Sequence, residues 1–194
     1  ASDKINANFT ELYSVATITR RVVVNTIADL PAAVGGVITL ADNALYLQAD
    51  NIDLSTVRFV GGINTVYSGL NSLVVTLNYT GTLPLFTFTN VSSTVKNLNI
   101  IHPNAPLFSY SDNAGNALRV SDVSYTGSSI GTFAGTGSGM RLTNFSGATT
   151  SNGMLFTGDW RVFLLEPSLS TIAAGSFIDF ASATFDAISI SETF

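Results

Sequence analysis

The sequence predicts an all-β solenoid: a right-handed parallel β-helix with three faces and about 22 residues per coil, preceded by a short N-terminal helix. Three observations support this prediction. Phenylalanines recur at regular intervals, short runs alternate apolar and polar residues, and glycine, asparagine, serine and threonine separate these runs. Self-similarity with such a period is typical of stacked architectures, in which each repeat buries its apolar side chains against its neighbours.

The aromatic repeat is the clearest of these signals. Its central residues recur at nearly constant intervals, and they are Phe86, Phe108, Phe133, Phe156 and Phe177. Successive coils of a β-helix stack about 4.8 Å apart, as paired strands do, and place equivalent residues above one another. We therefore expect an interior aromatic ladder, in which each ring pair adds about 0.5–1.5 kcal/mol beyond simple burial.

A second repeat lies between the aromatic residues. Its apolar positions recur at one constant interval, at Leu98, Val120, Leu142 and Leu164. Each coil therefore holds at least two short strands, and further strands are expected over residues 37–40, 44–48, 51–54, 57–60 and 72–79. An antiparallel β-sandwich is the alternative, but it gives no reason for the regular spacing.

The N-terminal region divides from the solenoid by its pattern. Residues 14–36 are interpreted as a connector with one helical turn within residues 27–33. The one longer helix is expected between Ser2, a plausible N-cap, and Tyr13. Its apolar face comprises Ile5, Phe9, Leu12 and Tyr13. This helix either covers the end of the solenoid or forms one strand of a parallel three-helix bundle, with these four residues at the trimer interface. The resulting domains are a neck of residues 1–36 and a β-helix of residues 37–194.

The composition excludes several classes of protein. Charged residues make up 11% of the chain, less than half of the usual share of about 25%. Such a surface suits β-structure and contact with other subunits. The net charge of −5 excludes a basic nucleic-acid footprint, and the absence of cysteine excludes disulfides and thiolate metal sites. No run of about 18 apolar residues occurs, so we expect no membrane insertion.

Acidic residues near the C-terminus are the candidates for catalysis. Glycoside hydrolysis needs two carboxylates about 5–5.5 Å or 6.5–9.5 Å apart. Asp159 and Asp179 are separated by close to the length of one coil, so the two side chains could stack on one edge; Glu166 and Asp186 lie nearby. Trp160 could stack on a sugar ring and bind a glycan. The favoured interpretation is structural, with aspartates bonded to turns and a packed tryptophan, so no catalytic residue is assigned.

Other polar residues have similarly structural interpretations. His102 is the single histidine and is expected in a surface loop, without the partners of a catalytic triad. Asp50, Asn51 and Asp53 contain enough oxygen atoms to suggest a calcium site, but a turn is favoured. No metal or cofactor is expected.

Two further features belong to the coils themselves. Asn97, Asp122 and Asn144 are predicted to stack as a polar ladder along the solenoid. The glycine-rich stretch 131–139 precedes a strand rather than a helix, so it is interpreted as a loop of the repeat and not as a phosphate site.

Two parts of the sequence carry a family resemblance. Residues 1–13, ASDKINANFTELY, resemble a segment common in bacteriophage tail fibre and tailspike proteins. The later residues resemble a phage pectate-lyase-like β-helix, at 26–32, 38–40, 46–47, 52–54, 63–70 and 95–100. The resemblance implies a parallel homotrimer, attachment to a virion and a role in host recognition.

The function expected from this reasoning is structural. The chain would be a component of a phage tail in the virion, linking the tail to host-surface recognition and binding cell-surface glycans. Its partners would be two further copies, other tail or baseplate proteins and a host-surface polysaccharide. A polysaccharide depolymerase, acting as hydrolase or lyase with Asp159 and Asp179, is one alternative. A cellular adhesin with the same rod shape is another.

Overall fold

A computed structural model describes residues 18–70, 75–151, 153–166, 169–172, 176 and 178–190. Strands make up 69% of the structure and helix 2%. The elements in chain order are β1 Arg20–Val24, η1 Ile27–Asp29, β2 Val37–Thr39, β3 Ala44–Gln48, β4 Ile52–Asp53, β5 Arg58–Val60, β6 Thr65–Gly69, β7 Thr76–Asn78, β8 Phe86–Thr89, β9 Ser93–Asp112, β10 Ala117–Thr149, β11 Met154–Leu165, β12 Leu169–Ile172 and β13 Ile178–Ile190.

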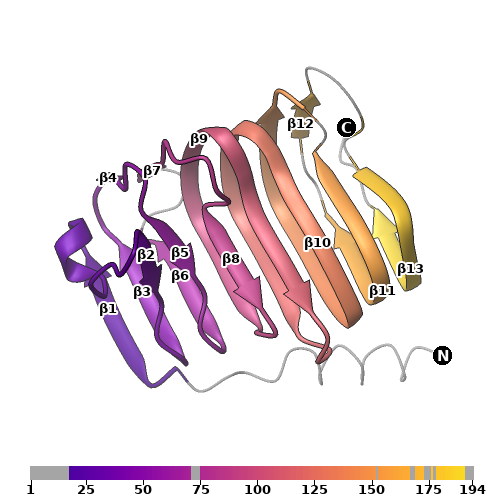
Figure 1. The fold of residues 1–194 in the computed structure, drawn as a ribbon, viewed down its shortest axis with the longest axis horizontal. Coiled ribbons are helices and arrows are strands. Elements are labelled where there is room, and N and C mark those ends of the chain that lie inside the picture. The colour runs from indigo at the N-terminus through magenta and orange to yellow at the C-terminus, as the bar shows by residue number, and fades with distance from the viewer. Residues whose placement is uncertain are drawn as a thin grey trace.

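The strands stack into a parallel β-solenoid. The order β1-β3-β6-β9-β10-β11-β13 runs from one end to the other, and Figure 1 shows these strands side by side along the long axis. The solenoid has about 6 turns of about 24 residues each. The predicted fold class is therefore confirmed, with coils slightly longer than the sequence period indicated.

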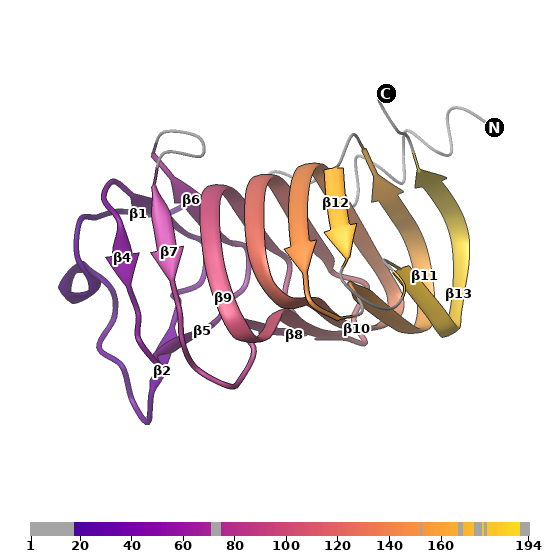
Figure 2. The same cartoon turned by 90° about the horizontal axis from the view of Figure 1, so that it is seen from above.

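Strand pairing defines three faces. The first face contains β1, β3, β6 and residues 93–96 of β9. The second contains β4, β7 and residues 99–101 of β9, and the third contains β2, β5, β8 and residues 108–111 of β9. From β9 onward the strands bend around the corners, so that β10, with 33 residues, exceeds one coil. Figure 2 shows these long ribbons wrapping continuously around the core.

Polar residues with left-handed backbone conformation make the corners. Asn97, Asp122 and Asn144 have φ angles of 56°, 54° and 49°. Asparagine and aspartate tolerate this conformation better than other residues with a side chain. Asn144 Nδ2 donates to Asp122 Oδ1 at 2.8 Å, while Asn97 Nδ2 donates to Ser68 Oγ at 3.4 Å. The predicted polar ladder is thus confirmed for Asp122 and Asn144.

An aromatic ladder fills the core beneath the third face. Neighbouring ring centroids are 5.2, 5.8, 6.4, 5.1 and 5.7 Å apart along the series Phe59, Phe86, Phe108, Phe133, Phe156 and Phe180. These distances lie in the range of favourable aromatic pairs. The ring contacts confirm the predicted ladder for its first four members, and Phe59 extends it. The strand register nevertheless places Phe133 opposite Tyr110 and Gly131 opposite Phe108, so the ladder shifts by two residues between these coils. Phe177 lies outside the described residues.

The second apolar repeat is buried at Leu98, Val120 and Leu142, but its members are not in register at one constant interval. Leu98 pairs with Val123 and Leu142 with Leu165, whereas Leu164 lies opposite Arg141 on the outer side. The reason is that coil length varies, and a shift of one residue along a strand moves a side chain from the core to the surface.

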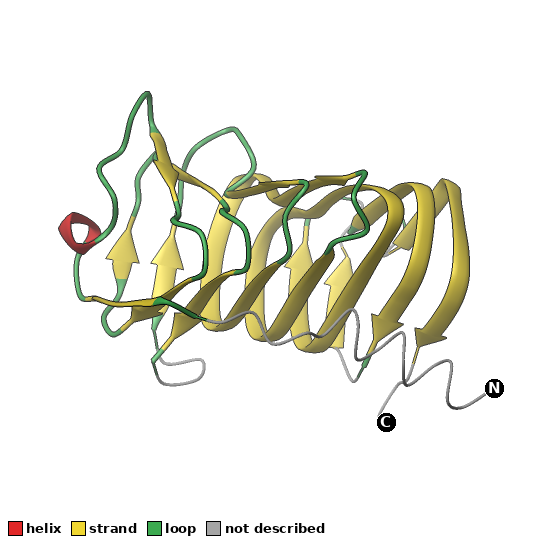
Figure 3. Cartoon of the chain, turned by 90° about the horizontal axis from the view of Figure 1, so that it is seen from below, coloured by secondary structure: helices red, strands yellow, loops and turns green. Residues whose placement is uncertain are grey.

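The solenoid begins at β1, which lies within the segment of residues 14–36 that is interpreted as a connector. This strand pairs with β3, so part of that segment belongs to the first coil. The expected helical turn is a 3-10 turn, η1, which is drawn in red in Figure 3. Asp29 stabilises it by accepting bonds from the backbone N–H groups of Asn25 and Thr26, each at 2.9 Å. The expected helix with Ile5, Phe9, Leu12 and Tyr13 lies outside the described residues. Across the part of the chain that the structure describes, no helix is long and apolar enough to span a membrane.

Candidate functional site

A polar groove of about 440 Å³ crosses the outer surface at the end of the third face, over β8 to β11. This volume falls within the range of about 300–1,000 Å³ that is usual for small-molecule sites. The residues that line it are Thr89, Asn90, Ser111, Asp112, Asn113, Ala134, Gly135, Thr136 and Gly158. All of them except Asp112 and Gly135 are exposed. The lining therefore combines hydroxyl, amide and small side chains with one carboxylate, that of the buried Asp112.

A ladder of hydroxyl side chains leads along the third face into this groove. Two outward rows are in register across β8 to β11: Thr87, Ser109, Thr132, Leu155 and Thr89, Ser111, Ala134, Thr157. The residues between these rows point inward and are aromatic, as at Phe88 and Tyr110. Strand alternation thus places hydroxyl groups outside and the aromatic core inside on the same strands.

Small residues form the floor of the groove because Trp160 lies directly beneath it. A Cβ atom at Gly135 would lie 2.7 Å from Cε2 of the Trp160 ring, so a larger residue there would displace the indole. Trp160 is only 2% exposed, and its Nε1 donates to the Thr157 carbonyl at 2.9 Å. Its ring packs against Phe156 and Phe185. The packed interpretation of Trp160 is therefore the one observed, and its ring offers no exposed face to a sugar.

The loop of residues 112–116 forms one wall and is held by the buried carboxylate of Asp112. This carboxylate accepts bonds from the Asn116 backbone N–H at 2.7 Å, the Asn116 amide at 2.8 Å and the Ser138 hydroxyl at 2.6 Å. Asn113 N–H donates to Asn90 Oδ1 at 2.9 Å and joins the loop to the previous coil. Because its oxygens already accept these bonds, Asp112 acts in positioning the wall.

Arg161 ties three successive coils together beside the groove. Its Nε donates to the Gly137 carbonyl at 2.5 Å, and its terminal nitrogen donates to the Gly115 carbonyl at 2.7 Å. Both glycines have left-handed φ angles, 65° and 74°, and form the corner turns. Hydrogen bonds from a charged donor are stronger than neutral ones, so this clamp keeps the corner fixed.

The two predicted catalytic carboxylates are not stacked. Asp159 lies opposite Thr136 on one side and Thr184 on the other, and it accepts a hydrogen bond from the Thr184 hydroxyl. Asp179 lies opposite Leu155, which is four residues before Asp159 on β11. At about 3.3 Å per residue the two positions are roughly 13 Å apart along the strand, beyond the roughly 9.5 Å that an inverting pair allows. The expected stacking was wrong because the coil from β11 to β13 is longer than the spacing of the two aspartates.

The other two acidic candidates also lie apart from the groove. Glu166 forms an ion pair with Arg141 at 2.7 Å and accepts a bond from the Thr143 hydroxyl. The bond from Arg141 is the main reason that the pKa of Glu166 lies below its usual value. Asp186 is exposed on β13. Of the acidic residues within the described ranges, only Asp112 lines the groove.

His102 is buried, contrary to the expected surface loop. It belongs to β9, its side chain is 0% exposed, and its ring meets that of Tyr79 edge-on with centroids 4.4 Å apart. Neither imidazole nitrogen has a hydrogen-bond partner among the described residues. Burial is the main reason that the pKa of His102 is lowered; backbone groups of Tyr79, Pro106 and Leu83 oppose this effect.

Two of the three candidate calcium residues use their side-chain oxygens to accept backbone N–H groups. Asp53 Oδ1 accepts the Ser55 N–H at 2.8 Å within a turn, and Asn51 Oδ1 accepts the Thr76 N–H of the next coil at 2.7 Å. No group of three or more histidine, aspartate or glutamate side chains suited to a metal occurs in the described ranges.

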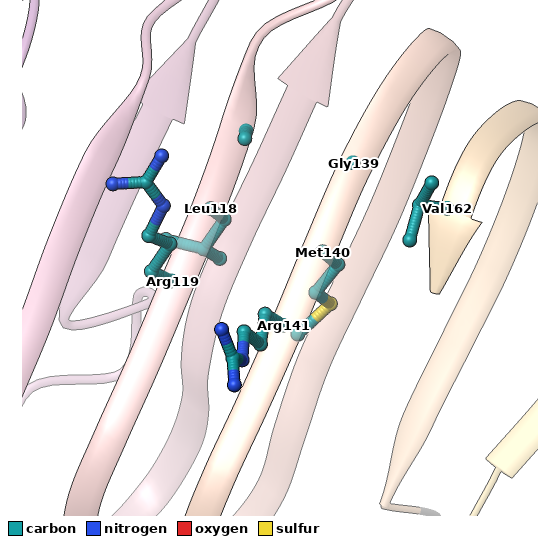
Figure 4. Close-up of a pocket in the computed structure, with 7 residues that line it drawn as sticks. Leu118, Arg119, Gly139, Met140, Arg141 and Val162 are labelled. Atoms are coloured by element: carbon teal, nitrogen blue, oxygen red, sulfur yellow. The ribbon is translucent and has the colours of Figure 1, made fainter. Parts of the chain in front are cut away.

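A second, much smaller crevice lies on the first face. Its volume is about 10 Å³, about the smallest that holds one water molecule. Figure 4 shows Arg119 and Arg141 extending from neighbouring coils beside it. The crevice is too small for any larger ligand, so the polar groove is the better candidate site.

The groove was not found from the sequence, although a signal was present. The T-F-T, S-Y-S and T-F-A triplets that begin at Thr87, Ser109 and Thr132 place two outward polar or small residues on each coil.

Comparison with protein-family models, with curated proteins and with solved structures found no match to this chain.

Proposed function

We propose that this chain is a structural segment of a bacteriophage tail fibre or tailspike. In this proposal it assembles as a parallel homotrimer in the virion and links the tail to recognition of the host surface. The observation that carries the proposal is the parallel β-solenoid with its continuous aromatic core. The resemblance of residues 1–13 to tail fibre segments supports the same assignment.

A solenoid of this kind suits a mechanical role. Its coils are joined by backbone hydrogen bonds along the axis, so a load applied at one end passes through every coil interface and is shared there by the strand pairs on the three faces. Six coils at about 4.8 Å each correspond to a rod of roughly 30 Å. A rod of this length serves as a spacer between an attachment point and a distal binding part.

The lateral surface supports assembly with other chains. Charged residues make up only 11% of the sequence, and several large apolar side chains are exposed, including Val23 at 48%, Ile63 at 50% and Leu83 at 55%. Exposed apolar surface favours association, because burial between subunits removes it from water. Association of three copies would cover such faces.

The polysaccharide depolymerase is the less favoured alternative. Cleavage by two carboxylates requires both at one site, but the strand register separates Asp159 from Asp179. The side chains in the groove are suited to hydrogen bonding rather than to proton transfer. Binding of a surface glycan without cleavage therefore agrees better with the geometry.

Immunogold electron microscopy tests the proposal. Antibodies raised against the purified chain should label the tails of phage particles produced by the strain that carries the gene. Labelling of the bacterial envelope in the absence of phage particles would instead favour the cellular adhesin. Particles whose tails remain unlabelled would contradict the assignment.

A further inference from the structure

We propose that the polar groove binds an uncharged stretch of a glycan chain and excludes acidic polysaccharides. This inference rests on the proposed function, because attachment to a host surface brings the rod against glycans. It adds a site and a chemical class of ligand.

The lining matches the hydrogen-bonding chemistry of sugars. Among the exposed residues that line the groove, Thr89, Ser111 and Thr136 carry hydroxyl groups, and Asn90 and Asn113 carry amides. The Ser111 hydroxyl donates to Thr89 Oγ1 at 3.4 Å and Asn90 Oδ1 accepts the Asn113 N–H, which leaves further donors and acceptors on these groups. Each of these groups both donates and accepts hydrogen bonds. Sugar hydroxyls have the same dual character, so a polyol can satisfy such a lining without any charged group.

The electrostatics of the groove disfavour an anion. No lysine or arginine lines it, whereas Asp112 lies in its wall and Asp159 beside Thr136 at its edge. The chain as a whole has a net charge of −5. The Arg161 guanidinium beside the groove already donates to the Gly137 and Gly115 carbonyls, so a uronic acid or sulfated sugar would approach this negative field without a cation among the lining residues to pair with.

The groove is already shaped before any ligand arrives. The Asp112 carboxylate fixes the wall, Arg161 clamps the corner turns, and Trp160 supports the floor from below. Binding to such a rigid surface costs little conformational entropy on the protein side. The groove also crosses several coils in line with the hydroxyl ladder, a geometry that favours an extended ligand over a compact one.

Binding of the purified, full-length chain to an array of bacterial surface polysaccharides, half neutral and half acidic, tests the inference. We expect retention on neutral polysaccharides only. Ala134→Phe places a ring in the groove at an exposed position and should abolish retention. Thr126→Phe is the matched control, because Thr126 is exposed on the same strand but lies opposite Ile101 on the second face, away from the groove and from the hydroxyl ladder. Asn113→Ala should weaken binding about fivefold, the equivalent of one hydrogen bond of about 1 kcal/mol.

Several outcomes would overturn the inference. They are retention on acidic polysaccharides alone, retention on none of the array, and equal retention of the Ala134→Phe and Thr126→Phe variants. Circular dichroism of each variant separates loss of the groove from loss of the fold. A negative array with labelled virion tails would reject the groove alone, whereas a positive array with unlabelled tails would reject the virion assignment alone.

Discussion

Protonation of His102 should control the stability of the solenoid below neutral pH. The imidazole is 0% exposed and neither nitrogen has a hydrogen-bond partner in the described part of the chain, so the folded state accommodates the neutral ring. Burial lowers the pKa of His102 from 6.5, whereas the unfolded chain keeps that value. Two tyrosines lie next to His102: Tyr79 packs on its ring, and the Tyr125 hydroxyl donates to its backbone carbonyl. Burial raises the pKa values of both tyrosines, so they stay neutral below neutral pH.

The sign and size of the effect follow from these pKa values. Because the folded pKa is depressed, the contribution to stability is fully present above pH 6.5 and is lost as the pH falls toward the folded pKa. In that window the unfolded state binds up to one more proton than the folded state. The free energy of unfolding should therefore fall by up to about 1.4 kcal/mol per pH unit.

Urea unfolding at pH 7.5, 6.5 and 5.5 measures this slope, with the fluorescence of the single tryptophan, Trp160, as the signal. His102→Phe should remove the slope, because it removes the titratable ring while it keeps an aromatic side chain against Tyr79. Ile101→Thr, at the exposed neighbouring position, should keep the slope of the parent protein. A stability that is constant between pH 7.5 and 5.5, or an unchanged slope in His102→Phe, would refute the reasoning.

Three further predictions concern the ladder, the corner clamp and the surface ion pair. Phe133→Ala should destabilise the chain by about 3–5 kcal/mol in urea unfolding, because it opens a cavity inside the aromatic ladder; a loss below about 1 kcal/mol would mean that the ladder is not tightly packed. Arg161→Met should cost about 1.5–3 kcal/mol through the loss of bonds to the Gly115 and Gly137 carbonyls, whereas Arg21→Met, at an exposed position, should cost almost nothing. Glu166→Gln should cost less than about 1 kcal/mol at pH 7, because the ion pair of Glu166 with Arg141 is partly exposed. Since the pKa of Glu166 is depressed, this small contribution is present above pH 4.5 and disappears as the pH falls. A larger loss of stability at pH 7 would show that the pair is better shielded from water than its exposure indicates.

The sequence predicted the solenoid because the interior of a coil repeats in one dimension. Every coil must place an aromatic residue above that of the previous coil, so Phe86, Phe108 and Phe133 recur at visible intervals. The polar corner residues Asp122 and Asn144 follow the same logic, since the same backbone turn is needed in each coil.

The site was harder to predict because it depends on register rather than on period. A spacing close to one coil suggests that Asp159 and Asp179 could stack, but the coil from β11 to β13 is longer than that spacing, so Asp179 pairs with Leu155 and Asp159 with Thr184. The glycine-rich stretch 131–139 was interpreted as a loop, whereas it lies within β10 and contributes to the groove. The need for glycine at position 135 is explained by the Trp160 ring beneath it, which no local pattern reveals.

His102 shows a similar limit. A single histidine before a proline has the local features of a surface turn. Its burial results from the stacking of coils, which brings Tyr79 of the preceding coil against its ring. Only the packing of segments distant in sequence determines such an environment.

The mass of the purified chain in solution, measured by light scattering after size exclusion, tests the central proposal of a trimeric virion rod most directly. We predict a mass of three times 20.4 kDa, and we predict that Phe9→Asp lowers it if the N-terminal segment holds the chains together. A stable species of 20.4 kDa at all concentrations would contradict the trimer and would favour a single-chain rod.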